Sequence, residues 1–270
     1  MFYRDVPADA VILAAGLGSR LRPLTDARPK PLVEVRGVPI LHNALRSLAM
    51  AGVHRVTLVV GYCQDTIERS CGSEFAGLEI EYVRSARFDS TGSAYSLWLA
   101  RETLLRGDVL LLEGDVFFDP SLLQRVLCLA GDVTALDAFD DTMSGSAARV
   151  TQDGRVLEIR MNQSAASLNG EPLYKTVNIH RFTGQSLRQA IVPALDGMVA
   201  AGQHRSYVEQ VLAQLIASGA LEVRGAPCNG VRWFEIDSES DLRIAESIFA
   251  PPMPRHQKPA AAPLALAAAT

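Results

Sequence analysis

The sequence lacks the cysteine spacing that a zinc site or a disulfide framework requires. It has four cysteines in 270 residues, and none of them lies in a Cys-x-x-Cys pair. Structural zinc sites and redox motifs depend on such closely spaced pairs. We therefore expect reduced thiols, which fit a cytoplasmic location. The four residues are Cys63, Cys71, Cys128 and Cys228.

Long apolar runs and strongly basic regions are also absent. No apolar run approaches the ~20 residues that span a bilayer. The N-terminal stretch MFYRDVPADAVILAAG lacks the pattern of an export signal, because its short apolar run leads into a glycine-containing loop. The net charge is −4, and acidic and basic residues are mixed throughout, which does not favour a nucleic-acid surface. We expect no membrane partner and no nucleic-acid partner.

The first 115 residues alternate between strand-like and helix-like segments. Short apolar runs alternate with segments whose apolar residues recur at helical spacing. This order predicts an α/β fold, a Rossmann-like three-layer sandwich in which helices cover both faces of a mostly parallel central sheet. Ligands bind such sheets at the carboxyl ends of the strands. The predicted strands are 9–14, 54–61, 78–83 and 108–115, and the predicted helices are 40–51, 65–71 and 93–105.

The rest of the chain is less regular and predicts a small β-rich insertion. Asp153-Gly154 lies between two β-rich runs and is a hairpin signal, whereas 162–172 is loop-like. We expect one domain over 1–250 and a disordered Pro- and Ala-rich tail over 251–270. The other predicted helices are 121–130, 184–201, 206–218 and 238–249 (capped by Ser238 and Asp241), and the other predicted strands are 132–139, 174–182, 221–227 and 231–236.

A loop with two glycines follows the first predicted strand, in the stretch AVILAAGLGSRLRPLTDARPKPLVEV (residues 10–35). A dinucleotide-binding loop needs a third glycine, where Leu21 stands, and a helix directly after it, where Pro23 follows. A P-loop needs a terminal Gly-Lys-Ser/Thr, which this stretch does not have. The loop therefore matches neither of these phosphate-binding motifs.

The same loop is rich in cations and prolines. Gly16 and Gly18 let backbone N–H groups approach phosphate oxygens closely, and prolines restrict where the cations point. Four cations accompany a single acid, Asp26. This combination suits a triphosphate better than a dinucleotide or a surface loop whose arginines contact only water. The cations are Arg20, Arg22, Arg28 and Lys30, and the prolines are Pro23, Pro29 and Pro31.

The stretch LAAGLGSRLRPLTDARPKPLVEVRGVPIL resembles the signature of the nucleotidyltransferase superfamily, which includes sugar-1-phosphate nucleotidylyltransferases and phosphocholine- and phosphonate-type cytidylyltransferases. It resembles the pattern L-A-A-G-x-G-[ST]-R-[LM]-x-P-L-T-x-x-x-P-K-P-L at nearly every fixed position. The resemblance continues through Asp115, resumes at Lys175 and Asp237, and covers about residues 8–250. It implies transfer of a nucleoside monophosphate from an NTP to an acceptor phosphate, with release of pyrophosphate.

The resemblance implies roles for the residues of this loop. Arg20 matches the arginine that contacts the triphosphate, and Lys30 matches the lysine that neutralises the reacting phosphates, so both are predicted catalytic residues. Gly61-Tyr62 and Ser90–Ser93 are predicted to border the base, although a strand-to-helix turn and a helix cap would explain them as well. The predicted nucleotide-binding residues are Leu13, Ala14, Ala15, Gly16, Gly18, Ser19, Gly61, Tyr62, Ser90, Thr91, Gly92, Ser93 and Glu113.

Two aspartates are predicted to bind Mg²⁺, the cofactor that the resemblance implies. Asp115 ends a predicted buried strand in LLLEGDVFF and matches the family's metal aspartate. Asp237 in RWFEIDSESDL matches the second metal aspartate of cytidylyltransferase-like members, and Glu235 is expected to lie behind it. Mg²⁺ takes one or two carboxylates together with phosphate oxygens and water, so two aspartates suffice.

Departures from the sugar-phosphate members favour a cytidylyltransferase. STGSAYSL stands where those members carry a G-T-A-type motif, and VLEIRMNQSA lacks the Lys and Pro of their E-K-P motif. We expect transfer of CMP from CTP to a small phosphonate or phosphate monoester, similar to 2-aminoethylphosphonate or phosphocholine. Lys175, Asn178 and Arg160 are the predicted acceptor-binding residues, and the β-rich insertion is expected on this acceptor side.

Other interpretations stay open at the level of sequence. One is a sugar-1-phosphate nucleotidylyltransferase that uses UTP, dTTP or GTP, and another is a nucleotide-binding regulatory protein without catalysis. The oligomeric state is also open, a homodimer included. His180, Trp98 and Trp233 are expected to pack rather than react.

Overall fold

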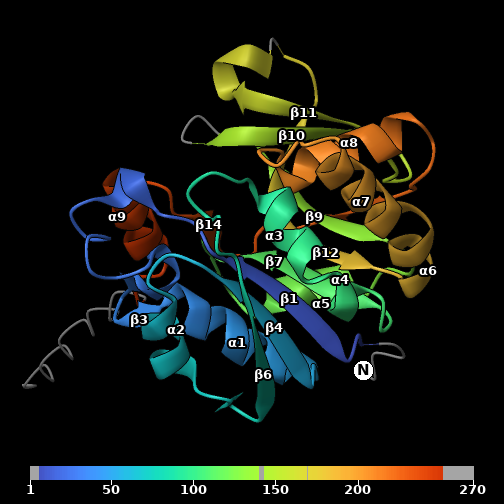
Figure 1. Ribbon diagram of the computed structural model, residues 1–270. Helices are drawn as coiled ribbons and strands as arrows, with labels where there is room; N and C mark the ends of the chain where they lie inside the picture. Colours follow the sequence, from blue (N-terminus) through green and yellow to red (C-terminus); the bar gives the residue numbers. More distant parts are fainter. Residues whose placement is uncertain (1–5, 140–142, 169, 252–270) are drawn as a thin grey trace, which may run out of the picture.

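A ten-stranded mixed sheet forms the centre of the computed structural model, which describes residues 6–139, 143–168 and 170–251. Four of its strands run parallel in the order β7-β1-β4-β6 (Figure 1). Ile12 of β1, for example, pairs with Leu58 of β4. The carboxyl ends of these strands therefore meet at one edge of the sheet. The four are β1 (Asp9–Ala14), β4 (Arg55–Val60), β6 (Leu78–Arg84) and β7 (Val109–Glu113).

The other half of the sheet is largely antiparallel and contains the predicted β-rich insertion. β12 pairs with β7, β9 and β10, and β10 forms a hairpin with β11. The hairpin turns at Asp153-Gly154, where Gly154 has a φ of +85° that glycine adopts without strain. The predicted hairpin is thus confirmed, and Figure 1 shows it projecting from the sheet. The strands of this half are β9 (Val133–Ala138), β10 (Ser144–Val150), β11 (Val156–Ser164), β12 (Tyr174–Phe182) and β13 (Arg224–Pro227). At the opposite edge of the sheet, β5 (Glu74–Phe75) pairs with β6.

Alternate residues of the parallel strands face two different hydrophobic cores, because side chains alternate across a strand. On one face, Ile12 and Leu58 pack with α1, α2 and α5. On the other face, Val11 and Val59 pack with α3, α4, α7 and α8. These layers confirm the predicted three-layer sandwich. The helices are α1 (Ile40–Ala51), α2 (Gln64–Cys71), α3 (Ser93–Leu99), α4 (Arg101–Leu104), α5 (Ser121–Leu127), α6 (Gly184–Ser186), the π-helical turn η4 (Leu187–Ile191), α7 (Val192–Ala200) and α8 (Val208–Ala217).

A third, smaller core packs the glycine- and cation-containing loop against the C-terminal helix. Leu21 of the loop and Phe234 are both buried in this core, which holds the loop near the segment that contains Asp237. The last helix begins with the predicted capping box, in which the Ser238 hydroxyl accepts a hydrogen bond from the Asp241 N–H. The elements around this core are the 3₁₀ turns η1 (Ser19–Leu21) and η2 (Lys30–Leu32), the strands β2 (Glu34–Val35), β3 (Val38–Pro39), β8 (Val116–Phe118) and β14 (Trp233–Glu235), and the helix α9 (Glu239–Ile248).

Two expectations from local patterns are wrong. The predicted single helix 93–105 is broken at Ala100, whose ψ of 12° lies outside the helical range. Residues 162–164, predicted to be loop, belong to β11, because the partner strand β10 satisfies their backbone; the 3₁₀ turn η3 (Ala165–Leu168) follows. The hairpin therefore extends further from its Asp153-Gly154 turn than the local sequence pattern indicates.

Residues 252–270, nearly all of the predicted tail, lie outside the described residues. No helix in the described part of the chain is long and apolar enough to cross a membrane.

Leu45 and Met50 offer a matched test of how α1 packs on the sheet. Leu45 is fully buried, whereas Met50 on the same helix is 75% exposed. Leu45→Ala should lower the free energy of unfolding by about 2–5 kcal/mol, because it removes buried apolar atoms and leaves a cavity. Met50→Ala should change it by less than about 0.5 kcal/mol. Urea unfolding measures both variants, and equal effects would contradict this packing.

His180 of β12 is buried and stacks on Phe182, as expected for a packing residue. Burial lowers its pKa to about 4, compared with about 6.5 in an unfolded chain. Between these values the unfolded protein binds a proton that the folded protein does not, so stability falls as the pH falls. The loss should be about 2 kcal/mol between pH 7 and pH 5. His180→Phe should remove this part of the pH dependence of urea unfolding, and an unchanged dependence would show that His180 does not cause it.

Candidate active site

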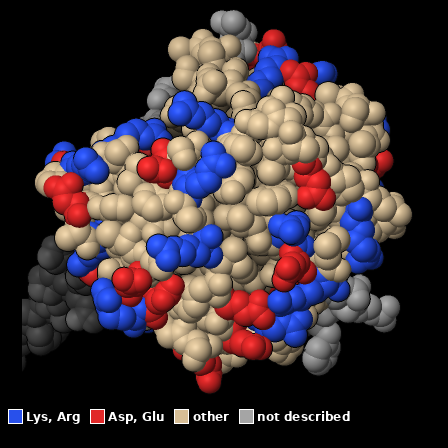
Figure 2. Space-filling view, in the orientation of Figure 1, with Lys and Arg blue, Asp and Glu red and all other residues tan. Residues whose placement is uncertain are grey.

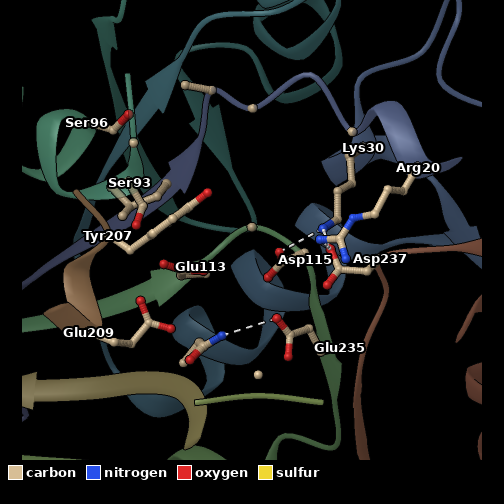
Figure 3. A pocket seen from close by; sticks show the side chains of 18 of the residues that line it. Arg20, Lys30, Ser93, Ser96, Glu113, Asp115, Tyr207, Glu209, Glu235 and Asp237 are labelled. Atoms are coloured by element: carbon tan, nitrogen blue, oxygen red, sulfur yellow. Dashed lines mark hydrogen bonds and ion pairs between the residues drawn. The ribbon is translucent and has the colours of Figure 1, made fainter. Parts of the chain in front are cut away.

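A cleft of about 780 Å³ lies at the carboxyl edge of the parallel strands. Its walls are the glycine-containing loop, the end of β7, the β10–β11 hairpin and the first turn of α8 (Figure 3). Its size is typical of small-molecule sites. The structure brings most of the predicted residues to this cleft, namely Leu13, Ala14, Ala15, Gly16, Gly18, Ser19, Arg20, Lys30, Thr91, Gly92, Ser93, Glu113, Asp115, Asn178 and Asp237.

An ion cluster lies at one end of the cleft. The Lys30 Nζ donates to Asp115 Oδ2 at 2.8 Å and to Asp237 Oδ1 at 2.7 Å, and an Arg20 nitrogen lies 2.9 Å from the same Asp237 oxygen. Burial alone would lower the pKa of Lys30, but the charges and hydrogen bonds of the two aspartates outweigh burial and raise the pKa. Lys30 is therefore a permanently charged, nearly buried ammonium, which a strongly anionic ligand would meet on entry.

Close backbone packing positions this cluster. Gly114 precedes Asp115, and a Cβ on Gly114 would lie 2.7 Å from the Leu13 carbonyl oxygen. Gly18 adopts a left-handed φ of +60°, and a Cβ there would lie 2.7 Å from the Lys30 Cβ. Any larger residue at either position would push a charged side chain out of place. The two glycines therefore allow the close approach that brings Lys30 and Asp115 together.

The two aspartates fit a Mg²⁺ ion in the presence of substrate phosphates. The Asp115 Oδ1 is buried and has no hydrogen-bond partner among the described residues. Carboxylate oxygens are the ligands that Mg²⁺ prefers, and phosphate oxygens and water complete its shell. The described residues contain no group of three or more His, Cys, Asp or Glu side chains arranged to hold a metal on their own. The protein alone thus offers a partial site that a nucleotide would complete.

Three residues predicted to border the base lie outside the lining of this cleft. Tyr62 donates its hydroxyl hydrogen to the backbone oxygens of Thr25 (3.0 Å) and Asp26 (2.9 Å), and so it clamps the cationic loop from behind. Gly61 packs tightly against Phe88, and the Ser90 hydroxyl donates to a backbone oxygen. These contacts fit the strand-to-helix turn that the sequence left open for Gly61-Tyr62, whereas Ser90 does not cap α3, whose N-cap is Gly92.

The three predicted acceptor-binding residues do not lie together in the structure. Lys175 is 3% exposed in its side chain and lies 2.9 Å from Glu235. It lines a smaller cavity of about 220 Å³ that shares Glu235 with the main cleft. Asn178 lines the cleft and donates to Glu235 at 3.4 Å. Arg160 pairs with Glu158 and Glu171 and does not line the cleft.

Sequence reasoning did not place several cleft residues. Glu235 was expected only behind Asp237, yet it lies in the cleft wall, and burial raises its pKa to about 7 even though Lys175 opposes this. Glu209 and Tyr207 come from the first turn of α8, which the chain reaches about ninety residues after β7. No local signal distinguishes Glu209 from an ordinary acid in the first turn of a helix, because Tyr207 and Gln210 beside it are exposed.

The comparisons with known proteins agree with this geometry. Residues 9–137, which carry the cationic loop and Asp115, match the sequence model of the Nucleotidyl transferase family. The match covers just under half of the chain, so the segment with the cationic loop and Asp115 is similar to this family.

Two curated relatives carry more specific names. The CMP-5'-(3-aminopropyl)phosphonate synthase of Streptomyces rubellomurinus is 36% identical over 250 residues, which are 92% of this chain and 40% of that protein. The UTP–glucose-1-phosphate uridylyltransferase AglF of Haloferax volcanii is 39% identical over 113 residues, which are 42% of this chain and 45% of AglF. The chain therefore spans less than half the length of either relative.

A solved structure supports the fold assignment. It describes the CTP:phosphocholine cytidylyltransferase LicC from Streptococcus pneumoniae and superposes with a TM-score of 0.75, covering 89% of this chain and 98% of its own. The two chains are 22% identical, so the likeness confirms the architecture and no more.

Tyr62→Phe should loosen the cationic loop without disturbing the core. The variant loses both hydrogen bonds to Thr25 and Asp26 but keeps the aromatic ring. Amide hydrogen exchange over residues 18–30 should become severalfold faster, because each lost bond contributes about 0.5–1.5 kcal/mol. Tyr95→Phe is the control, since no hydrogen bond of its hydroxyl is seen in the described part of the chain. Unchanged exchange in Tyr62→Phe would contradict the clamp.

Proposed function

We propose that this protein is a Mg²⁺-dependent cytidylyltransferase, which transfers CMP from CTP to a small phosphonate or phosphate monoester and releases pyrophosphate. The observation that carries the proposal is the cluster of Lys30, Arg20 and two aspartates at the carboxyl edge of the parallel strands. Opposite charges gathered there suit a triphosphate bound together with a divalent cation. A dinucleotide held without cleavage would not require this charge density.

The reaction needs charge neutralisation rather than a base. An oxygen of the acceptor attacks the α-phosphorus of CTP while the bond from that phosphorus to the bridging β-phosphate oxygen breaks. The acceptor oxygen is already ionised at neutral pH. Lys30, whose side chain is 13% exposed, supplies a point charge in poorly solvated surroundings, and Arg20 supplies a fork for two oxygens. Asp115 and Asp237 would hold Mg²⁺, which stabilises charge on the reacting phosphates.

The choice of CTP and of a non-sugar acceptor rests on relatives and on cleft chemistry. The relative that matches 92% of the chain is named for a CMP-phosphonate product. The β11 segment in the cleft wall presents Met161, Asn162 and Gln163 and lacks the charged motif of the sugar-phosphate members. The four free thiols support a reducing compartment such as the cytoplasm.

A second candidate is a sugar-1-phosphate nucleotidylyltransferase that uses UTP, dTTP or GTP. The match to AglF favours it, but that match covers less than half of the chain. Both candidates use the same cationic loop and the same aspartates. They differ in the base and in the acceptor.

Pyrophosphate release separates these candidates. Four NTPs would each be combined with 2-aminoethylphosphonate, phosphocholine, other phosphonates and sugar-1-phosphates in the presence of Mg²⁺. CTP preference with a non-sugar acceptor supports the proposal. Turnover only with a sugar phosphate establishes the second candidate, and no turnover with any pair indicates a binding protein without catalysis.

Lys30→Ala should lower kcat by about 10²–10³ or more, by analogy with the loss of one preorganised donor at a reacting oxygen. The fold should persist, since Lys30 belongs to neither of the two main hydrophobic cores. Arg243→Ala, which removes an exposed cation of α9, serves as the control and should retain wild-type turnover. Near-wild-type turnover in Lys30→Ala would refute the assigned role.

A further inference from the structure

The two cations that line the cleft lie at one end, where Asp115 and Asp237 pair with them. Arg20 and Lys30 lie at one end, and Glu113 and Glu209 lie at the other, as Figure 3 shows. The cations belong to the cationic loop, whereas Glu113 ends β7 and Glu209 opens α8. A ligand that spans the cleft therefore meets cations paired with aspartates at one end and the carboxylates of Glu113 and Glu209 at the other.

Glu209 is a buried carboxylate without a cation partner. Its residue is 8% exposed, yet it lines the cleft. Within the described ranges it forms no ion pair, and its oxygen accepts a weak hydrogen bond of 3.4 Å from the Ser146 hydroxyl. Burial raises its pKa. Removing a charged carboxylate from water costs free energy unless a cation or hydrogen-bond donors compensate it. A cationic ligand with several N–H donors would offset this cost at Glu209.

Asn178 adds a neutral acceptor that is also without a partner. Its residue is 3% exposed and lines the cleft, and its Oδ1 is buried with no hydrogen-bond partner in the described part of the chain. The side-chain nitrogen is held by Glu235 at 3.4 Å, which orients the amide. Asn178 has a φ of +59°, and the pairing of β12 with β9 is irregular around it. The surrounding structure holds the backbone in this strained conformation.

Within the described ranges, neither Glu113 nor Glu209 forms an ion pair with a cationic side chain. Lys175, whose charge favours ionised Glu209, is already paired with Glu235 at 2.9 Å. Two carboxylates and an amide oxygen thus line the cleft without an ion-paired cation in the described part of the chain.

We propose that Glu209, together with Glu113 and the Asn178 Oδ1, binds a primary ammonium group on the acceptor, so that the acceptor is an aminoalkyl phosphonate or phosphate. This inference rests on the proposed function. A primary ammonium has three N–H donors, and the region offers carboxylate and amide acceptors for them. A trimethylammonium has no such donors and is typically bound in an aromatic cage, whereas Phe88 and Tyr207 are the aromatic residues in the described lining.

The first experiment uses wild-type protein and three acceptors of similar size. With CTP and Mg²⁺, kcat/KM for 3-aminopropylphosphonate is expected to exceed that for propylphosphonate, which lacks the amine, by about 10- to 100-fold, the range for a hydrogen bond to a charged group. Phosphocholine should fall below the primary amine as well. Equal kcat/KM with and without the amine would overturn the inference, and so would a preference for phosphocholine.

The second experiment assigns the preference to Glu209. Glu209→Gln keeps the shape and removes the charge, so it should raise KM for 3-aminopropylphosphonate about 10- to 100-fold and leave KM for CTP and kcat/KM for propylphosphonate near wild type. Glu222→Gln changes an exposed carboxylate outside the cleft and is the matched control. Retention of the amine preference in Glu209→Gln would refute the role of Glu209.

The two experiments distinguish failure of this inference from failure of the proposed function. If wild-type protein releases no pyrophosphate with any acceptor, the proposed function itself is wrong. If it is active but indifferent to the amine, only the ammonium site is wrong. Thermal unfolding shows whether Glu209→Gln folds. If it does not, Glu113→Gln with the same two acceptors provides the test. The comparison of acceptors with wild-type protein does not depend on either variant.

Discussion

The site depends on the ion cluster in which Lys30 bridges Asp115 and Asp237. These partners lie 85 and 207 residues from Lys30 in the chain, so the cluster joins the loop after β1, the end of β7 and the segment after β14. Burying the carboxylates of Asp115 and Asp237 near each other would be costly without the Lys30 ammonium between them. The small core around Leu21 and Phe234 supports this arrangement, because it packs the cationic loop against β14 and α9. The same charges that hold the three segments together are those that would receive a triphosphate.

The cleft outside this cluster is shaped by a different electrostatic balance. Lys175 is neutralised by Glu235, while Glu113 and Glu209 form no ion pair within the described residues. The outer surface differs from the cleft, since Figure 2 shows basic and acidic side chains interspersed over the visible face. In the cleft, by contrast, the two lining cations are gathered with Asp115 and Asp237 at one end, and Glu113 and Glu209 lie away from them. A zwitterionic acceptor, with its anionic group toward Arg20 and its ammonium toward Glu209, would complement both ends.

The sequence predicted the parts of the protein that depend on local patterns and on the signature. The parallel strands, the Asp153-Gly154 hairpin and the Ser238 cap follow from periodicity and turn chemistry, and the structure confirms them. The signature predicted that Arg20, Lys30, Asp115 and Asp237 would gather. Glu209 could not be found in this way, because its position depends on how α8 packs over the sheet. Tyr62 was placed at the base, but its hydroxyl instead holds the cationic loop, a contact between segments that no spacing reveals.

The central claim is that a new bond forms between the acceptor and CMP. Phosphorus NMR of a reaction with CTP, Mg²⁺ and 3-aminopropylphosphonate observes this bond directly. The account predicts that the acceptor phosphorus signal moves to that of a phosphonate–phosphate anhydride, coupled to the phosphorus of CMP, while free pyrophosphate accumulates in equal amount. Persistence of the free acceptor signal while CTP is hydrolysed, or no change in either compound, would contradict the account.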